Sequence, residues 1–202
     1  VRRILVTSAH PGEGKTTTAV ALGITMAQAG AKVLIVDTDL RKPRLHRAFG
    51  VSAQTGLTSA LMGASLDEAC KATELVGLDL LPCGPIPPNP SELLHSKPFT
   101  QLLDQLSERY DRVLLDSPPV DIVTDAAILS KIVDGTILVV QAHGTAKEVA
   151  RRAARRLTDV GASMLGVVLN DYDVEENGRD GYGVYQYYNS YSYGSDEDEA
   201  KV

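Results

Sequence analysis

The nine residues from Ala9 to Thr17 constrain the fold of this chain more than any other stretch. They read Ala-His-Pro-Gly-Glu-Gly-Lys-Thr-Thr, follow the apolar run 4–6, and precede apolar residues at helical spacing. A strand, a glycine-rich turn and the start of a helix form a phosphate-binding loop. In such a loop, glycines let successive amides point inward and the helix N-terminus carries partial positive charge. The sequence therefore predicts a phosphate site here.

Particular residues of this loop have expected roles. The Lys15 side chain would reach the β- and γ-phosphates, and the Thr16 hydroxyl would ligate Mg²⁺. One position departs from the pattern G-x-x-x-x-G-K-[ST], because Ala9 replaces the first glycine. An ordinary strand-to-helix loop with a chance Gly-Lys-Thr is the alternative, and the flanking elements disfavour it. The nucleotide-binding residues predicted in the loop are Gly12, Glu13, Gly14, Lys15, Thr16 and Thr17.

Composition narrows the class of protein. The chain has 202 residues, 44% of them hydrophobic, which suits one α/β domain with a buried core. Its net charge of −6 and the lack of a basic stripe argue against nucleic acid as a partner. Cys70 and Cys83 form no C-x-x-C pair, so we expect reduced thiols in a cytosolic protein and no zinc site. Because position 1 is Val and the first strand starts at once, we expect a piece of a longer protein.

Strand and helix patterns alternate along the chain. This alternation predicts an α/β fold of the P-loop NTPase type, with a mostly parallel sheet flanked by helices. Ligands of such sheets bind at the carboxyl ends of the strands. We expect a catalytic domain over 1–178 and a flexible tyrosine-rich tail over 179–202. The expected strands are 4–6, 32–36, 78–81, 112–115, 136–140 and 164–169, and the expected helices are 15–29, 98–109, 124–132 and 146–160.

Two expected strands end in carboxylates. Asp37, Asp39 and Arg41 follow the strand at 32–36, and Asp116 follows the strand at 112–115. An acid after a strand is usually a helix cap or a solvated turn. The phosphate loop reverses that expectation for Asp37 and Asp116, and Asp116 is interpreted as the Mg²⁺ partner beside the threonine hydroxyl.

The C-terminal segment is rich in tyrosine and acid. It has almost no aliphatic residues to bury, so we expect it to be mobile. A low-complexity tail without a role is the alternative interpretation. Its six tyrosines are Tyr182, Tyr185, Tyr187, Tyr188, Tyr191 and Tyr193, and the acidic run 196–199 follows them.

Together, the phosphate loop, the Asp-x-Asp-x-Arg strand end and the Asp-Ser-Pro-Pro strand end resemble the catalytic domain of bacterial tyrosine kinases of exopolysaccharide and capsule synthesis. The segment 84–94 is similar to that family's linker, and the resemblance covers nearly the whole chain. The related partitioning and septum-placing ATPases carry a signature lysine early in the loop, where this chain has His10. That departure favours the kinase.

The resemblance implies an ATP-dependent protein-tyrosine autokinase that phosphorylates the six tail tyrosines between subunits. It assigns Asp37 to metal binding and base catalysis and Asp39 to a supporting role, although spacing alone does not separate the two. Arg41 would steady the transferring phosphate or contact a neighbouring subunit. Asn170, which ends the last expected strand, would meet the adenine edge.

The resemblance also implies partners. These are a membrane-embedded activator, fused upstream or separate, a homo-oligomer such as a ring, and other protein substrates, all at the inner face of the plasma membrane. The family's oligomerisation motif Glu-x-x-Arg-x-x-Arg is absent, although Glu148-x-x-Arg151 begins like it. Phosphates on the tail would weaken its docking beside carboxylates and bound ATP, and so disassemble a ring.

Two alternatives to the autokinase stay open. One is a nucleotide-switched scaffold ATPase that uses its tyrosines only as a contact surface, and the other is a small-molecule kinase. The arginines on the expected helix 146–160 are interpreted either as a subunit contact or as a solvated helix face. They are Arg151, Arg152, Arg155 and Arg156.

Overall fold

The computed structural model describes residues 1–173 of the chain. The six tail tyrosines lie outside the described residues, so their role stays a prediction. Contacts divide the chain into a unit Val1–Asn170 and a unit Asp171–Val202. Every helix and strand in the described residues belongs to the first unit.

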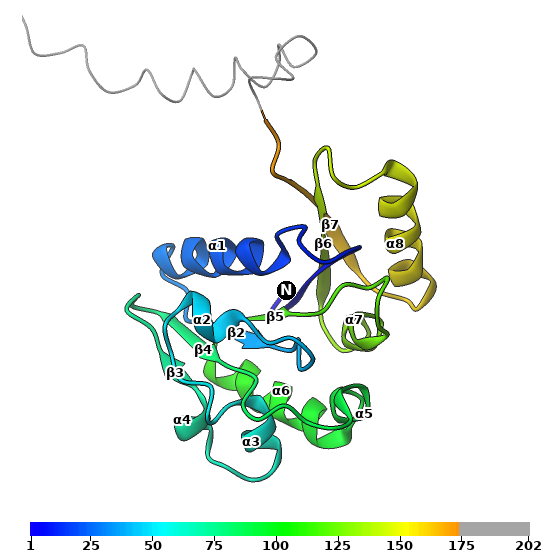
Figure 1. Ribbon diagram of the computed structural model, residues 1–202. Coiled ribbons are helices and arrows are strands. Elements are labelled where there is room, and N and C mark those ends of the chain that lie inside the picture. The colour runs from blue at the N-terminus through cyan, green and yellow to red at the C-terminus, as the bar shows by residue number, and fades with distance from the viewer. Residues whose placement is uncertain (174–202) are drawn as a thin grey trace, which may run out of the picture. The chain divides into compact units, whose positions relative to one another are not determined.

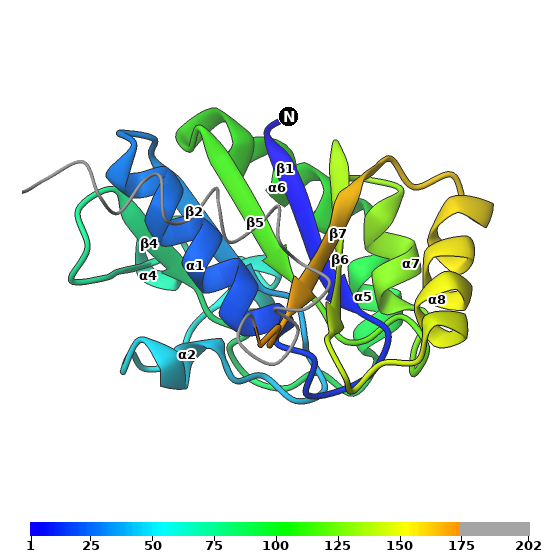
Figure 2. The ribbon, with the colours of Figure 1, turned by 90° about the horizontal axis from the view of Figure 1, so that it is seen from above.

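One sheet organises this unit, and within the described residues it has seven strands (Figures 1 and 2). Their spatial order is β3-β4-β2-β5-β1-β6-β7, and every neighbouring pair is parallel except β3 with β4. The predicted α/β class with a mostly parallel sheet is confirmed. The strands are β1 (Arg3–Ser8), β2 (Val33–Asp37), β3 (Lys71–Ala72), β4 (Leu78–Leu81), β5 (Arg112–Asp116), β6 (Gly135–Gln141) and β7 (Met164–Asn170).

Four of the helices match the predicted ones, with ends that differ by up to two residues. The four short helices and β3 were not predicted, because segments of two to five residues carry no measurable periodicity. Among the helices of residues 1–173, none combines the length and the hydrophobicity of a membrane span. The predicted helices are α1 (Lys15–Gln28), α6 (Lys97–Arg109), α7 (Asp125–Ser130) and α8 (Lys147–Asp159), and the unpredicted ones are α2 (Leu45–Ala48), α3 (Leu57–Leu61), α4 (Leu66–Ala69) and α5 (Pro90–Leu94).

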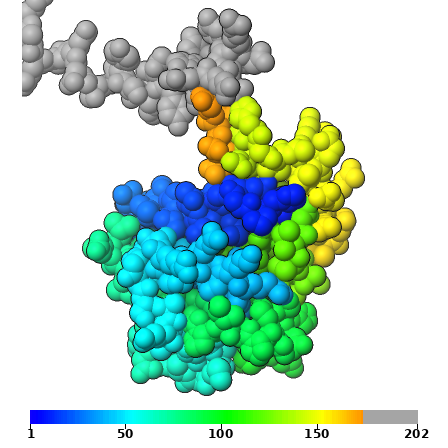
Figure 3. Space-filling view, viewed as in Figure 1, coloured from blue at the N-terminus to red at the C-terminus, as the bar shows by residue number. Residues whose placement is uncertain are grey.

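Helices cover both faces of the sheet, which explains why its central strands are buried along nearly their whole length and are mostly apolar. Alternate residues of β2 face opposite layers: Ile35 packs in the cluster that includes α1, and Leu34 packs in the cluster that includes α6. In the space-filling view, the dark-blue surface of α1 borders the lighter-blue surface of the segment after β2 (Figure 3).

Strand order places the predicted site. Because β5 lies between β2 and β1, the loops that follow these three strands leave the same edge of the sheet side by side. The register of β2 and β5 brings two acids together, because Asp37 at the end of β2 lies directly opposite Asp116 at the end of β5. Residues 79 positions apart in the chain are thereby neighbours.

Candidate active site

The loop between β1 and α1 has a backbone that only glycine adopts easily. Gly12 has φ 90° and Gly14 has φ 89°, both in the left-handed region. A Cβ on Gly14 would also lie 2.0 Å from the Asn170 side-chain nitrogen. Helix α1 starts directly after Gly14. The predicted strand, glycine turn and helix are therefore present in that order.

Glu13 holds this loop in shape. Its carboxylate is buried and accepts hydrogen bonds from the His10 backbone N–H, at 2.8 Å, and from the Thr145 hydroxyl. Its carbonyl accepts a 3.1 Å hydrogen bond from the Asn170 side-chain amide. Of the polar groups of Glu13, only the backbone N–H is therefore left to bind a phosphate. The contact of Thr145 was not predicted, because a threonine after a strand has no distinctive sequence pattern.

Thr16 and Asp116 form the clearest candidate for a metal site. The Thr16 hydroxyl donates a 2.7 Å hydrogen bond to Asp116 Oδ2. The second oxygen, Asp116 Oδ1, is buried and has no hydrogen-bond partner within residues 1–173. A buried acceptor without a donor is costly, and a cation would satisfy it. These residues therefore fit Mg²⁺, which binds through one or two carboxylates and takes its other ligands from phosphate and water.

Burial also changes the titration of this acid. It raises the pKa of Asp116 to about 6, against the opposing effects of the Lys15 charge and the Thr16 hydrogen bond. No group of three His, Cys, Asp or Glu side chains in residues 1–173 could hold a metal by itself. A metal at Asp116 would thus depend on the nucleotide for further ligands.

Asp37 lies beside Asp116 but is engaged by the backbone. Its two oxygens accept hydrogen bonds from the N–H of Asp39, at 3.3 Å, and of Leu45, at 3.1 Å. Burial and the neighbouring Asp116 charge raise the pKa of Asp37 to about 7. Asp37 shapes the loop after β2, and its role as base stays a prediction.

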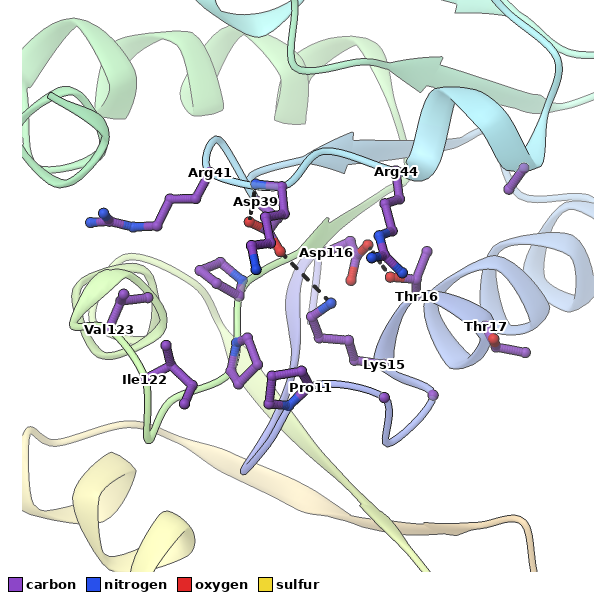
Figure 4. Close-up of a pocket in the computed structure, with 16 residues that line it drawn as sticks. Pro11, Lys15, Thr16, Thr17, Asp39, Arg41, Arg44, Asp116, Ile122 and Val123 are labelled. Atoms are coloured by element: carbon purple, nitrogen blue, oxygen red, sulfur yellow. Dashed lines mark hydrogen bonds and ion pairs between the residues drawn. The ribbon is translucent and has the colours of Figure 1, made fainter. Parts of the chain in front are cut away.

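Asp39 reaches the reaction space directly. It lines the cavity beside the phosphate loop, and its Oδ2 lies 3.9 Å from the Lys15 ammonium (Figure 4). Its Oδ1 accepts a 3.0 Å hydrogen bond from the Lys42 backbone N–H. Of the two acids Asp37 and Asp39, Asp39 is therefore the one that faces the predicted phosphate site.

Arg41 is bound within the protein. Its Nε donates to Asp125 Oδ2 at 2.9 Å, and its Nη2 donates to Asp125 Oδ1 at 3.2 Å and to the Ser91 hydroxyl at 2.8 Å. Asp125 is completely buried. Arg41 thus ties the loop after β2 to α5 and α7. The roles of Asp125 and Ser91 were not predicted. An acid at the start of a helix and a serine after a proline are common capping residues, so neither indicates a site.

One cavity of about 460 Å³ is lined by predicted site residues that include Lys15, Thr16, Asp39, Arg41 and Asp116, whereas Glu13 and Asp37 do not line it. The phosphate loop supplies its floor through Lys15 and Thr16, and the loop after β2 supplies a charged wall (Figure 4). The loop after β5 supplies an apolar wall that includes Ile122 and Val123. Such a space, with a cation, buried acids and an apolar side, suits a nucleotide and a second reactant.

Asn170 and two of the four arginines of α8, Arg152 and Arg156, make structural contacts. The Asn170 amide rests against Gly14 and does not line the cavity, so an adenine contact stays a prediction. Arg152 and Arg156 bind Asp121 at 2.7 Å and 3.2 Å, and thereby hold the loop after β5 against α8. His10 Nε2 lies 3.7 Å from the same carboxylate.

Comparison with known proteins agrees with this geometry. Residues 1–163 match the family described as AAA domain. The chain is 42% identical over 183 residues to the tyrosine-protein kinase YwqD of Bacillus subtilis, an alignment that covers 90% of this chain and 77% of that protein. The solved VpsO kinase domain superposes with a TM-score of 0.82 at 41% identity, over 85% of each chain. The septum site-determining protein MinD of Pyrococcus horikoshii, solved with Mg-ADP, is more distant: its TM-score is 0.72 at 27% identity, over 85% of this chain and 70% of that one.

Proposed function

The chain belongs to the AAA-domain family and, within it, to the bacterial tyrosine kinases, and from this premise we propose that it phosphorylates its own C-terminal tyrosines in trans. The donor is Mg-ATP, and the acceptors are Tyr182, Tyr185, Tyr187, Tyr188, Tyr191 and Tyr193 of a second copy. The observation that carries the proposal is the meeting of Lys15, Asp39 and Asp116 at one cavity in a chain of this family.

The residues divide the work of phosphoryl transfer. Lys15 and the inward amides of the phosphate loop bind and orient the β- and γ-phosphates. Thr16 and Asp116 hold Mg²⁺, which neutralises charge on the transferring group. In the structure, Asp39 is the ion-pair partner of Lys15. When the phosphates of ATP bind Lys15 in place of Asp39, the Asp39 carboxylate can face the hydroxyl of the acceptor tyrosine.

A carboxylate that accepts the phenol proton would assist the reaction, because a phenol with pKa ~10 is barely ionised at neutral pH. Asp37 and Asp39 are the two candidates. Burial and the Asp116 charge raise the pKa of Asp37, which favours a base role near neutrality. Cavity access favours Asp39.

We further propose that this kinase acts in polysaccharide synthesis or export, at the inner face of the plasma membrane. Its partners would be a membrane-embedded activator and other copies of itself, with other proteins as additional substrates. Family membership supports this setting.

The experiment is incubation of the purified chain with Mg-ATP, followed by mass spectrometry of the intact protein and its peptides. Phosphate on the tail tyrosines of the parent and none in Lys15→Met is the expected result. ATP turnover without tail phosphate, also after adding an activator segment from a relative, would contradict the proposal. That result would favour the scaffold ATPase, which the similarity to MinD supports more weakly.

A further inference from the structure

The cavity beside the phosphate loop carries two cations that the site described above does not use. Lys42 and Arg44 lie in the loop after β2, line the cavity and are exposed. Neither side chain makes a hydrogen bond or ion pair with any residue in the described part of the chain. Arg41, from the same loop, is bound to Asp125 instead. The cavity thus has an unneutralised positive rim.

The acids near this rim do not cancel its charge. Asp39 is paired with Lys15, and its other oxygen accepts a backbone hydrogen bond. Asp116 is 2% exposed and lies at the phosphate end of the cavity, beside Thr16. A ligand that approaches from solvent therefore meets the charges of Lys42 and Arg44 first.

The opposite wall of the cavity is apolar. Pro118, Pro119, Ile122 and Val123 line it, and Ile122 is 60% exposed although it is a large aliphatic residue (Figure 4). Aromatic rings pack well on prolines and aliphatic side chains. A ring on this wall would lie between the apolar surface and the basic rim.

The tail sequence has the complementary chemistry. In residues 174–202, acidic residues outnumber basic ones seven to two. Asp180 stands two positions before Tyr182, and the acidic run 196–199 starts three positions after Tyr193. The tyrosines at the two ends of the cluster therefore have acidic neighbours, whereas Tyr187 and Tyr188 have none within five residues.

We propose that Lys42 and Arg44 select, among tyrosines of a second copy of this chain, those flanked by acidic residues. This inference rests on the proposed kinase function and adds its acceptor specificity. The phenol ring packs against Pro119 and Ile122 while the flanking carboxylates pair with the rim. In the transfer, the phenol oxygen forms a bond to the γ-phosphorus, the bond from that phosphorus to the oxygen of the leaving ADP breaks, and the phenol proton passes to a carboxylate of the site.

Peptide phosphorylation by the full chain tests the proposal. The enzyme carries Phe at all six tail tyrosines, so that only added peptide accepts phosphate. The first peptide spans residues 189–200 with Tyr191→Phe, and the second is identical except that its four acids at 196–199 are replaced by their amides. We expect kcat/KM to be at least about fivefold higher for the acidic peptide, mostly through KM, because each exposed ion pair contributes about two- to fivefold.

Two enzyme variants complete the design. Lys42→Ala combined with Arg44→Ala should bring the acidic peptide down to the rate of the neutral one and leave the neutral peptide unchanged. The matched control is Arg47→Ala, because Arg47 is an exposed cation of the neighbouring α2 that does not line the cavity. This control variant should still phosphorylate the acidic peptide with a higher kcat/KM than the neutral one.

Three results would overturn the inference. Equal kcat/KM for both peptides would do so while leaving the kinase function intact. An equal loss for both peptides in the double variant, with a raised KM for ATP, would show that the rim binds nucleotide instead. If neither peptide accepts phosphate, also after adding an activator segment from a relative, the proposed function fails, and the inference is then judged by fluorescence anisotropy of both peptides with Mg²⁺ and a non-hydrolysable ATP analogue. Equal affinities there would refute it.

Discussion

The hydroxyl of Thr16 and the carboxylate of Asp116, 100 positions apart in the chain, are joined by a 2.7 Å hydrogen bond. This contact links the first turn of α1 to the end of β5. The other Asp116 oxygen is buried without a donor within residues 1–173. The pair offers two oxygen ligands of the kind that Mg²⁺ binds, and the phosphates of a nucleotide would supply further ligands.

Replacing Thr16 tests this pair. Thr16→Ala removes both the hydroxyl that we propose as a Mg²⁺ ligand and its hydrogen bond to Asp116, so we expect the apparent Mg²⁺ affinity in the transfer reaction to fall about 10- to 100-fold. Thr16→Ser keeps the hydroxyl and should stay close to the parent. The measurement is the rate of phosphate transfer against Mg²⁺ concentration. Matching Mg²⁺ curves for the two variants would refute the assignment.

Asp116→Asn should stabilise the nucleotide-free protein at high pH. Asp116 has a pKa raised to about 6, so the folded state retains a proton that the unfolded chain releases near the ordinary value of 3.8. Its contribution to stability is therefore full below about pH 4 and is lost as pH rises through 6. Asparagine carries no charge and still accepts the Thr16 hydrogen bond.

At pH 8 we expect Asp116→Asn to exceed the parent in free energy of unfolding by roughly 1–3 kcal/mol, with the difference vanishing near pH 4. Urea unfolding of both proteins without Mg²⁺, over pH 4 to 8, measures it. Phosphate transfer should be lost at every pH. A stability difference that does not depend on pH would contradict the raised pKa.

The two glycines of the phosphate loop form a matched pair. Both have φ near 90°, but only Gly14 has a neighbour where a Cβ would lie, the Asn170 amide at 2.0 Å. Gly12→Ala should cost about 1–2 kcal/mol of stability from the left-handed backbone alone, and Gly14→Ala should cost more. Adding Asn170→Ala to Gly14→Ala should recover the excess. Chemical denaturation compares the variants, and equal costs for the two glycines would show that the Asn170 contact yields freely.

Arg41→Ala separates a structural role from a catalytic one. It leaves the completely buried Asp125 with only the Ser91 hydroxyl as a side-chain partner within residues 1–173, so we expect a loss of about 1–3 kcal/mol in the free energy of unfolding. Asp125→Asn in the same chain should return part of that loss, because no buried charge then remains. Arg47→Ala, an exposed control, should change stability by less than about 0.5 kcal/mol. Unchanged stability in Arg41→Ala would assign Arg41 to the reaction alone.

Local patterns were enough for much of this molecule. The glycines, Lys15 and Thr16 could be recognised because a phosphate loop needs specific residues within nine positions of one another. The six predicted strands and four longer helices also follow from local periodicity, and so does their parallel arrangement. Helices α2 to α5 were missed because they are held by contacts with distant segments, such as the hydrogen bond from the Leu57 N–H to the Pro82 carbonyl.

The sequence by itself determined that Asp37, Asp39 and Asp116 would gather at one edge of the sheet, since the carboxyl ends of parallel strands all lie at the same edge. Only the tertiary structure decided their different environments. Burial raises the pKa of Asp37, and the register that sets it against Asp116 raises that pKa further. The turn after β2 directs Asp39 to Lys15 and leaves Lys42 and Arg44 open to solvent. Burial and partnership depend on which distant residues arrive at the same place, and no local pattern records that.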